Sequence, residues 1–269
     1  MADVKFASAA WGFREMPLPE YFEAARGLGL EFVEVNLSPL SPKHLTFEAT
    51  DAEVEAMVAH AADAGVQVVA LAGGNNFAAP DVAAEIAGVR RQIDMVALAG
   101  AQVLRIFAGW VGASQFSDAT FAQVSDALVQ VGEYAAEQGV QVAVENHGGI
   151  TATGAQCRRL LAEAVAGMPA GMPLGLNFDP ANFRHAGEDA LSALRVTGDL
   201  INYSHWKDVR YEDDEPEYCA VGEGVLDWAP IVAELRATGF DGYWAIEYET
   251  VADIVRGTRD SLAALRGLV

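Results

Sequence analysis

The stretch QVAVENH, residues 141–147, joins an apolar run to polar side chains that are suited to chemistry. The run has the composition of a buried parallel strand, and Glu145, Asn146 and His147 stand at its end. Three later runs repeat the pattern and end in metal-binding side chains: LGLNFD at Asp179, INYSH at His205 and YWAIE at Glu247. The carboxyl ends of parallel strands share one rim of a barrel, so we expect these residues to converge.

The rest of the chain also alternates between strand-like and helix-like segments, as in repeated βαβ units. The expected strands cover residues 4–10, 32–37, 66–71, 103–107, 141–145, 174–178, 201–205 and 243–248. Eight such units predict a (β/α)8 TIM barrel of the α/β class, formed as one domain by residues 1–269. A doubly wound sheet is the alternative, but AAWGFRE follows the first strand, where that fold needs a glycine-rich phosphate loop.

Local signals place some helix ends and loops. Asp51 is expected to cap a helix that Gly65 ends, and Asp227 is expected to cap a helix over residues 228–238. The acidic run 212–217 is interpreted as a solvated loop. Of the two cysteines, Cys157 is expected in a helix and Cys219 in a loop, and this usage fits reduced thiols in the cytoplasm.

The charge balance limits the classes of partner. The 269 residues include 38 acidic and 17 basic side chains, which gives a formal net charge of -21. Such a charge opposes binding to nucleic acid and to anionic membranes, and no apolar stretch has the length of a signal sequence or a membrane span. We therefore expect a cytoplasmic protein that acts on a small molecule, with no nucleic-acid or membrane partner. A homo-oligomer is left open.

The four strand-end side chains define a candidate metal site. Glu145, Asp179 and Glu247 are carboxylates and His205 adds one imidazole, a set that favours a hard or borderline divalent ion. We expect Mn²⁺, with Co²⁺, Mg²⁺ and Zn²⁺ as alternatives. Each residue alone could be a capping or salt-bridged side chain, but four of them at matching strand ends favour a shared site.

Four motifs carry a family resemblance: VENHGG, GLNFDPAN, SHWKD and VGEGVLDW. They resemble the sugar isomerase and epimerase superfamily, whose domain is a xylose-isomerase-like barrel, and the resemblance spans most of the chain. It implies that Glu145, Asp179, His205 and Glu247 bind a divalent metal, and that Glu145 and Glu247 also act as bases in the isomerase and epimerase branches. The superfamily also includes hydroxypyruvate isomerases, inosose and dehydroshikimate dehydratases and an endonuclease branch, so it gives no substrate.

The implied chemistry follows from a metal that holds the carbonyl of a ketose. The polarised carbonyl makes the neighbouring C–H acidic, and an enediolate can form. Carboxylates on both sides, Glu145 and Glu247, could remove the proton and return it to the other face or to the next carbon. We therefore expect an isomerase or epimerase of a small carbohydrate or keto-polyol.

Six further residues are candidates for substrate binding. Lys207 could hold a substrate oxygen, or it could pair with Asp208 or another rim carboxylate. The others are His147, Asn182, Arg210, Trp11 and Trp110, where the tryptophans stand at strand ends and could stack on a sugar ring. Trp206, Trp228 and Trp244 are interpreted as packing residues.

Departures from the resembled pattern keep other activities open. Ketose 3-epimerases usually add a histidine soon after the metal aspartate and an arginine after the metal histidine, whereas here Asn182 replaces the first and Arg210 only approximates the second. The acidic loops after the last two strands favour an unphosphorylated substrate.

The closest rival activity is a lyase or dehydratase that expels a β-substituent from a keto-sugar, keto-glycoside or inosose. A nuclease is disfavoured because five histidines are too few for a zinc cluster. A non-catalytic sugar-binding barrel is the remaining class.

Overall fold

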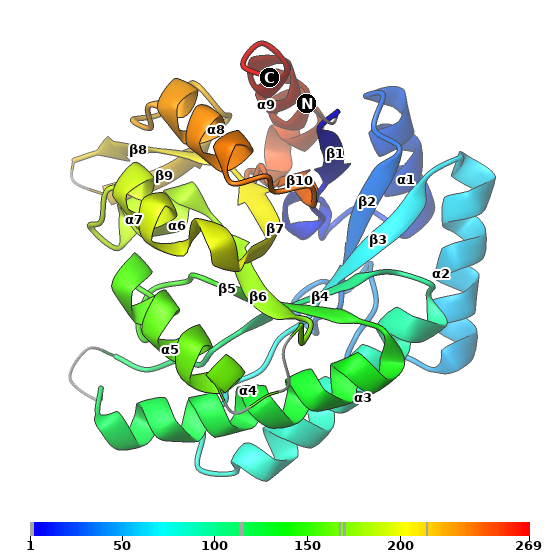
Figure 1. The fold of residues 1–269 in the computed structure, drawn as a ribbon. Coiled ribbons are helices and arrows are strands. Elements are labelled where there is room, and N and C mark those ends of the chain that lie inside the picture. The colour runs from blue at the N-terminus through cyan, green and yellow to red at the C-terminus, as the bar shows by residue number, and fades with distance from the viewer. Residues whose placement is uncertain (1–2, 113–115, 167, 169–170, 214) are drawn as a thin grey trace.

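A closed barrel of parallel strands forms the centre of the molecule, as Figure 1 shows for the computed structural model. The structure describes residues 3–112, 116–166, 168, 171–213 and 215–269. Around the barrel the strand order is β1-β10-β7-β6-β5-β4-β3-β2. The barrel strands are β1 (Lys5–Ser8), β2 (Phe32–Asn36), β3 (Gln67–Ala72), β4 (Val103–Phe107), β5 (Gln141–Glu145), β6 (Leu174–Phe178), β7 (Ile201–Trp206) and β10 (Tyr243–Ile246). The expected TIM barrel is therefore confirmed.

Helices surround the barrel and pack on its outer face (Figure 1). They are α1 (Leu18–Gly27), α2 (Asp51–Ala64), α3 (Val82–Leu98), α4 (Asp118–Gln138), α5 (Gly154–Ala166), α6 (Pro180–His185), α7 (Ala190–Thr197), α8 (Trp228–Ala237) and α9 (Ile254–Arg266). Short 3-10 helices are η1 (Trp11–Phe13), η3 (Gly198–Leu200) and η4 (Val251–Asp253). In the described part of the chain, no helix has both the length and the apolar character needed to cross a membrane.

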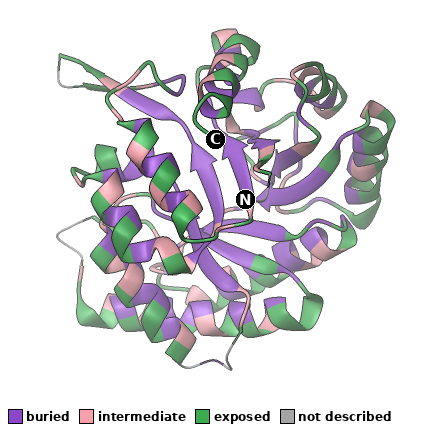
Figure 2. Cartoon of the chain, turned by 45° about the horizontal axis from the view of Figure 1, so that its top comes forward, coloured by how far each residue is buried: buried purple, intermediate pink, exposed green. Residues whose placement is uncertain are grey.

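The barrel strands and the surrounding helices differ in their exposure to solvent. Figure 2 shows buried strands at the centre and helices whose outward faces are exposed. Trp206 and Trp244 stack with ring centroids 4.1 Å apart and planes 6° apart, and Trp228 packs 5.5 Å from Trp206. All three indoles are buried between strands and helices, which confirms that they are packing residues.

The cap of α2 lies one residue before the position expected from the sequence. Thr50, not Asp51, is the N-cap, and Gly65 ends the helix in a left-handed conformation at φ 72°. The Thr50 hydroxyl accepts from the backbone N–H of Glu53, while a Glu53 carboxylate oxygen accepts from the backbone N–H of Thr50. This reciprocal pair satisfies two N–H groups that the helix itself cannot bond.

Thr50→Ala is expected to lower the free energy of unfolding by about 1 kcal/mol, because it removes half of this reciprocal pair. The measurement is urea unfolding followed by circular dichroism. Glu55→Ala, an exposed position on the same helix, is the control and should change the value by less than about 0.5 kcal/mol. Equal losses in the two variants would contradict the capping role.

An antiparallel hairpin replaces the solvated loop that the sequence suggested. Strands β8 (Asp208–Glu212) and β9 (Glu215–Cys219) pair next to the barrel, so Cys219 lies in a strand rather than in a loop. The described acidic residues near the turn are exposed, as the interpretation required, and the hairpin projects from the barrel in Figure 2. Cross-strand pairing, which composition does not reveal, orders this segment.

The carboxylate of Asp208 fixes the base of this hairpin. It accepts hydrogen bonds from the indole N–H of Trp228 and from the backbone N–H groups of Val209, Gly222, Gly224 and Leu226. A Cβ at position 224 would collide with this carboxylate, which explains the glycine there. The motifs SHWKD and VGEGVLDW, apart in sequence, thus meet at one buried side chain.

Candidate metal centre and active site

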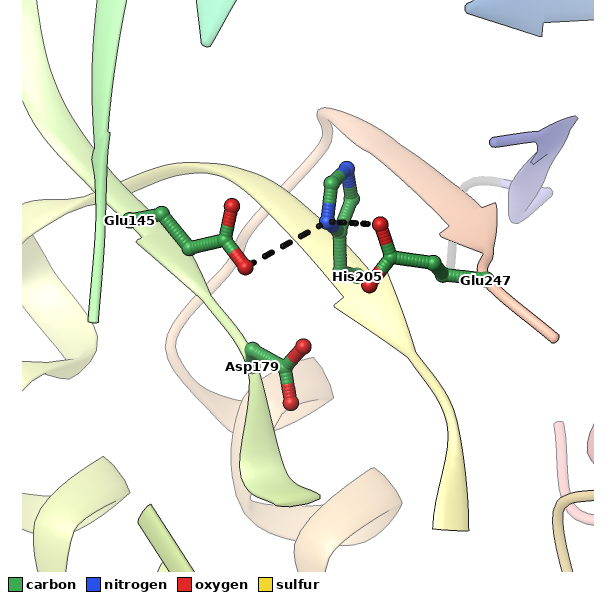
Figure 3. A group of neighbouring side chains, drawn as sticks. All are labelled: Glu145, Asp179, His205 and Glu247. Atoms are coloured by element: carbon green, nitrogen blue, oxygen red, sulfur yellow. Dashed lines mark ion pairs between the residues drawn. The ribbon is translucent and has the colours of Figure 1, made fainter. Parts of the chain in front are cut away.

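Four buried side chains converge at the carboxyl rim of the barrel (Figure 3). Glu145 ends β5, Asp179 follows β6, His205 lies in β7 and Glu247 follows β10. Each offers a ligand atom, and these atoms all lie within 4.8 Å of one another. The convergence expected from the strand ends is therefore present.

The orientation of His205 makes this cluster suitable for a cation. Its Nε2 lies 2.9 Å from Glu34 Oε2, so Nε2 can donate a proton to that carboxylate. Its Nδ1 then faces Glu145 Oε1 at 3.8 Å and Glu247 Oε1 at 3.3 Å. The Nδ1 atom and the two carboxylate oxygens are all acceptors, so they repel one another unless a cation lies among them. In addition, a carboxylate that accepts from the other ring nitrogen, as Glu34 does here, is the usual support of a metal-binding histidine. The donor set therefore fits a divalent metal ion.

The charges around His205 act on its pKa. Burial lowers the pKa, but the carboxylates of Glu247, Glu34 and Glu145 outweigh burial and raise it well above 6.5. Without a metal, a proton on Nδ1 can thus occupy the place between the two glutamates. Proton and metal ion meet the same requirement, which is positive charge at this point.

The pKa values of the carboxylates differ because their neighbours differ. For Glu145, burial raises the pKa, but Arg105 and His205 lower it to about 2. The Arg105 Nε lies 3.1 Å from Glu145 Oε2, and both side chains are buried. Burial raises the pKa of Asp179 to about 7, although Lys207 opposes this effect. Glu145 is therefore ionised at neutral pH, the state that metal binding and proton abstraction both require.

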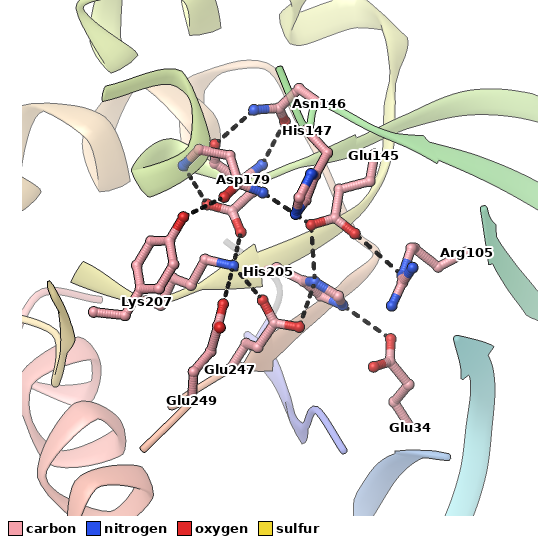
Figure 4. A network of polar contacts seen from close by, with 12 residues as sticks. Glu34, Arg105, Glu145, Asn146, His147, Asp179, His205, Lys207, Glu247 and Glu249 are labelled. Atoms are coloured by element: carbon pink, nitrogen blue, oxygen red, sulfur yellow. Dashed lines mark hydrogen bonds and ion pairs between the residues drawn. The ribbon is translucent and has the colours of Figure 1, made fainter. Parts of the chain in front are cut away.

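Lys207 lies at the centre of the carboxylate network in Figure 4. Its Nζ is 2.6 Å from Glu247 Oε2, 2.6 Å from Glu249 Oε1 and 3.1 Å from Asp179 Oδ2. The pairing with a rim carboxylate that the sequence left open is therefore present, but it does not involve Asp208. Burial lowers the pKa of Lys207, and the adjacent carboxylates more than reverse this effect and raise it well above 10.5.

Asparagines support the candidate metal ligands. The Asn182 amide donates to Glu145 Oε1 at 3.0 Å, while the Asn182 backbone N–H donates to Asp179 Oδ1 at 2.9 Å. Asn146 exchanges two hydrogen bonds, both 2.8 Å, with the backbone of Asp179. These contacts join the ends of β5 and β6 and hold the carboxylates in place. Asn182 thus touches a metal-ligand candidate directly.

A cavity of about 800 Å³ reaches this centre. Besides the two glutamates, four of the candidate residues line it: Trp11, Trp110, His147 and Lys207. Asn182 lies behind the lining residue Tyr218, whose hydroxyl donates to Asn182 Oδ1 at 3.3 Å. The His147 ring packs edge-on against Phe107 and Trp110, and burial is the main cause of its lowered pKa. These candidates therefore lie around one space.

Arg210 is not brought to this cavity. It lies in β8, where its guanidinium pairs with Glu217 across the hairpin at 2.9 Å. Hairpin register places these two side chains opposite each other, and both are partly exposed. A substrate contact by Arg210 stays a prediction.

Three side chains that contact the candidate site were not identified from the sequence. Glu34 supports His205, Arg105 pairs with Glu145, and Tyr218 from the hairpin lies 4.7 Å below Lys207 Nζ. Glu34 and Arg105 are charged residues inside the apolar runs FVEVN and VLRIF. A charge within a buried strand is a signal of a polar partner, and it could have identified both.

The fold and the four converging side chains define an α/β barrel with a candidate divalent-metal centre at its carboxyl rim. The family described as xylose isomerase-like TIM barrel matches residues 22–268. The chain belongs to this family, which confirms the resemblance carried by the four motifs.

Curated relatives give a more limited match. Inosose dehydratase from Lacticaseibacillus casei is 27% identical over 150 residues, which are 50% of this chain and 49% of that protein. The inosose dehydratase of Geobacillus thermodenitrificans is 26% identical over 150 residues, again 50% of this chain and 49% of that protein. The chain thus spans about half the length of the curated relatives it matches.

Solved structures match nearly the whole fold. The probable 3-DHS dehydratase from Bacillus anthracis is 18% identical at a TM-score of 0.78, with 98% of this chain and 99% of that chain covered. The 3-keto-D-glucoside 4-epimerase from E. coli is 20% identical at a TM-score of 0.76, with 98% and 100% covered. At these identities the likeness shows the shared barrel.

Proposed function

We propose that the protein is a divalent-metal-dependent isomerase or epimerase of a small unphosphorylated carbohydrate or keto-polyol. The observation that carries the proposal is the position of Glu145 and Glu247 on opposite sides of His205 Nδ1, at 3.8 and 3.3 Å (Figure 3). Two carboxylates that face one point from different strands can remove a proton from one face of a planar intermediate and return a proton to the other face. Transfer of one proton between two faces or two carbons requires such a pair.

The residues of the candidate site have different roles in the proposed reaction. Glu145, Asp179, His205 and Glu247 would hold a divalent ion, which would supply a Lewis acid for the substrate carbonyl. One glutamate then removes the proton from the neighbouring carbon, and the other glutamate holds the proton that is returned. Lys207, with its positive charge beside Glu247, stabilises negative charge that develops on the substrate oxygens. We further propose Mn²⁺ as the ion, because three carboxylates and one imidazole suit it, with Co²⁺, Mg²⁺ and Zn²⁺ as alternatives.

The positively charged side chains of the cavity support an unphosphorylated substrate. The lining of the cavity includes Arg105 and Lys207, and both are already paired with carboxylates. A phosphate group would have to compete with these buried ion pairs. Trp11, Trp110 and His147 offer ring faces and edges instead, which suit the apolar face and the hydroxyls of a sugar.

A metal-dependent lyase is the second candidate. It shares the first proton abstraction but expels a β-substituent from a keto-sugar, keto-glycoside or inosose. The sequence match to inosose dehydratases supports this reading. So does the position of Lys207 Nζ, 2.6 Å from Glu247 and from Glu249, because an ammonium group there can donate a hydrogen bond to the negative charge on a departing oxygen.

The proposal predicts metal-dependent exchange of a substrate C–H proton. Full-length protein with Mn²⁺ is incubated in D₂O with free ketoses, 2-keto acids, inososes and 3-keto-glucosides, and NMR follows each carbon. Deuterium in a newly formed isomer, lost after chelation and restored by metal, is the expected result. Metal-dependent loss of water or an alcohol would move the assignment to the lyase. No exchange with any member of the panel would contradict both.

A further inference from the structure

The cavity above the candidate metal centre has two unlike ends. One end carries the charged groups of Glu145, Lys207, Glu247 and Glu249. The other is formed by segments that follow β2 and β4, with the apolar side chains of Pro39, Leu40, Phe47 and Trp110. Its volume of about 800 Å³ lies in the upper part of the range of roughly 300–1,000 Å³ for ligand pockets. The charged end would be filled by a carbonyl and its neighbouring hydroxyls, so space for a second group remains.

The apolar end is unusually open to solvent. Leu40 is 70% exposed and Trp110 is 53% exposed, the two largest values for large hydrophobic side chains among the described residues. Both line the same cavity. Exposed apolar side chains that line one pocket mark a place where a ligand or partner removes them from water.

Trp110 is held in position before any ligand arrives. Its backbone N–H donates to Asn76 Oδ1 at 2.9 Å. Its ring lies 4.7 Å from the Phe107 ring and packs edge-on against His147 at 5.3 Å and 81°. Arg105, which pairs with Glu145, lies 4.5 Å from the Phe107 ring on the inner side. A continuous aromatic wall thus leads from the metal centre to the surface.

Two of the amides beside this wall, those of Asn75 and Gln92, are already occupied. Asn75 donates to the backbone oxygen of Phe107 at 2.8 Å and accepts from its N–H at 2.9 Å. Gln92 makes the same pair of contacts with Gly74, at 2.9 and 3.2 Å. Neither amide is oriented toward a ligand hydroxyl. With these two amides engaged and four apolar side chains in the lining, this end of the cavity suits a flat apolar group better than a second sugar ring, which needs many hydrogen bonds.

We infer that the substrate is a two-part molecule, a sugar joined to an aromatic group. The sugar lies at the metal centre, and the aromatic group lies against Trp110 and Leu40. The substrate class is thus an aryl glycoside rather than a free monosaccharide. This inference rests on the proposed function, because that function places the carbonyl end of the substrate at the glutamates.

The test compares matched probes that lack a carbonyl and are not turned over. Methyl and phenyl glycosides of glucose, galactose, mannose and xylose, in both anomers, are titrated into the Mn²⁺-loaded protein by calorimetry. At least one phenyl glycoside is expected to bind about tenfold tighter than its methyl partner, an effect of the size expected for one buried aromatic group. Trp110→Ala should remove this preference, so that the phenyl and methyl glycosides of each pair bind with the same affinity.

Val225→Ala is the matched control, because Val225 is 51% exposed and does not line the cavity. It should keep the phenyl preference. Equal affinities within every pair, no binding of any phenyl glycoside, or a preference that survives Trp110→Ala would overturn the inference. A change of oligomeric mass in Trp110→Ala, measured by light scattering, together with an unchanged preference would assign this face to a second copy of the chain.

The two proposals fail in different ways. Phenyl preference without proton exchange on any carbonyl substrate would leave the aromatic site standing and contradict the proposed function. Exchange with free sugars and no phenyl preference would contradict the aromatic site and leave the proposed function standing.

Discussion

Glu145→Gln is expected to lower kcat by about 10³-fold or more. The amide is close in size to the carboxylate and can still accept from Asn182, but it cannot take up a proton at neutral pH. General-base catalysis alone contributes roughly 10²- to 10⁴-fold, and loss of a charged metal ligand adds to this. The substitution also leaves the buried Arg105 without its anionic partner. The measurement is turnover of the substrate that the exchange panel identifies.

Metal content separates the two causes of this loss. Bound metal is determined by mass spectrometry on the same sample, and kcat is expressed per bound ion. Glu215→Gln, an exposed carboxylate of the hairpin, is the control and should keep wild-type turnover. More than a tenth of wild-type turnover per bound ion in Glu145→Gln would contradict its role as a base.

The matching variant Glu247→Gln distinguishes the candidate activities. In an isomerase or epimerase with two bases, either variant should lose the new isomer, while the remaining glutamate still exchanges the proton on its own side. A lyase requires one base for the abstraction, so one of the two variants would retain elimination.

Glu34→Gln is expected to weaken Mn²⁺ binding about 10- to 100-fold. The charged carboxylate holds the Nε2–H of His205 and increases the basicity of Nδ1, which is the atom that faces the other ligands. A neutral amide gives less support and can also present its NH₂ group, which would favour the wrong tautomer of the ring. Calorimetric titration of the metal-free protein measures the change.

Glu31→Gln provides the control for this second variant. Glu31 lies close in sequence, but its side chain is 72% exposed and its contact with Arg26 is loose at 3.8 Å. The control should bind Mn²⁺ like the wild type, and circular dichroism should show the same fold in both variants. An unchanged metal affinity in Glu34→Gln would show that His205 does not depend on this carboxylate.

The sequence was sufficient to predict the four converging residues because their convergence depends on topology alone. Glu145, Asp179, His205 and Glu247 stand at the carboxyl ends of parallel strands, and a closed barrel brings all such ends to one rim. No knowledge of side-chain packing is needed for that step. The same argument brought Trp11, Trp110 and His147 to the cavity.

Contacts across the barrel could not be predicted in this way. Glu34 and His205 are 171 residues apart, and their strands β2 and β7 are not neighbours in the barrel. Their contact depends on the barrel radius and on two side-chain conformations. Arg210 illustrates the opposite case. It stands only three positions after Lys207 in the sequence, yet hairpin pairing turns its side chain to Glu217.

The anchoring of the hairpin at Asp208 has a consequence for divergence within the family. Both ends of the excursion from Val209 to Gly222 bond to the same carboxylate, so the segment between them can change in length or sequence while its attachment stays fixed. Tyr218 in this segment contacts Lys207 and Asn182, which border the candidate metal centre. We therefore expect exchange of the hairpin to alter substrate preference without moving the candidate metal ligands. One buried carboxylate therefore separates the attachment of the hairpin from the part of the hairpin that borders the candidate centre.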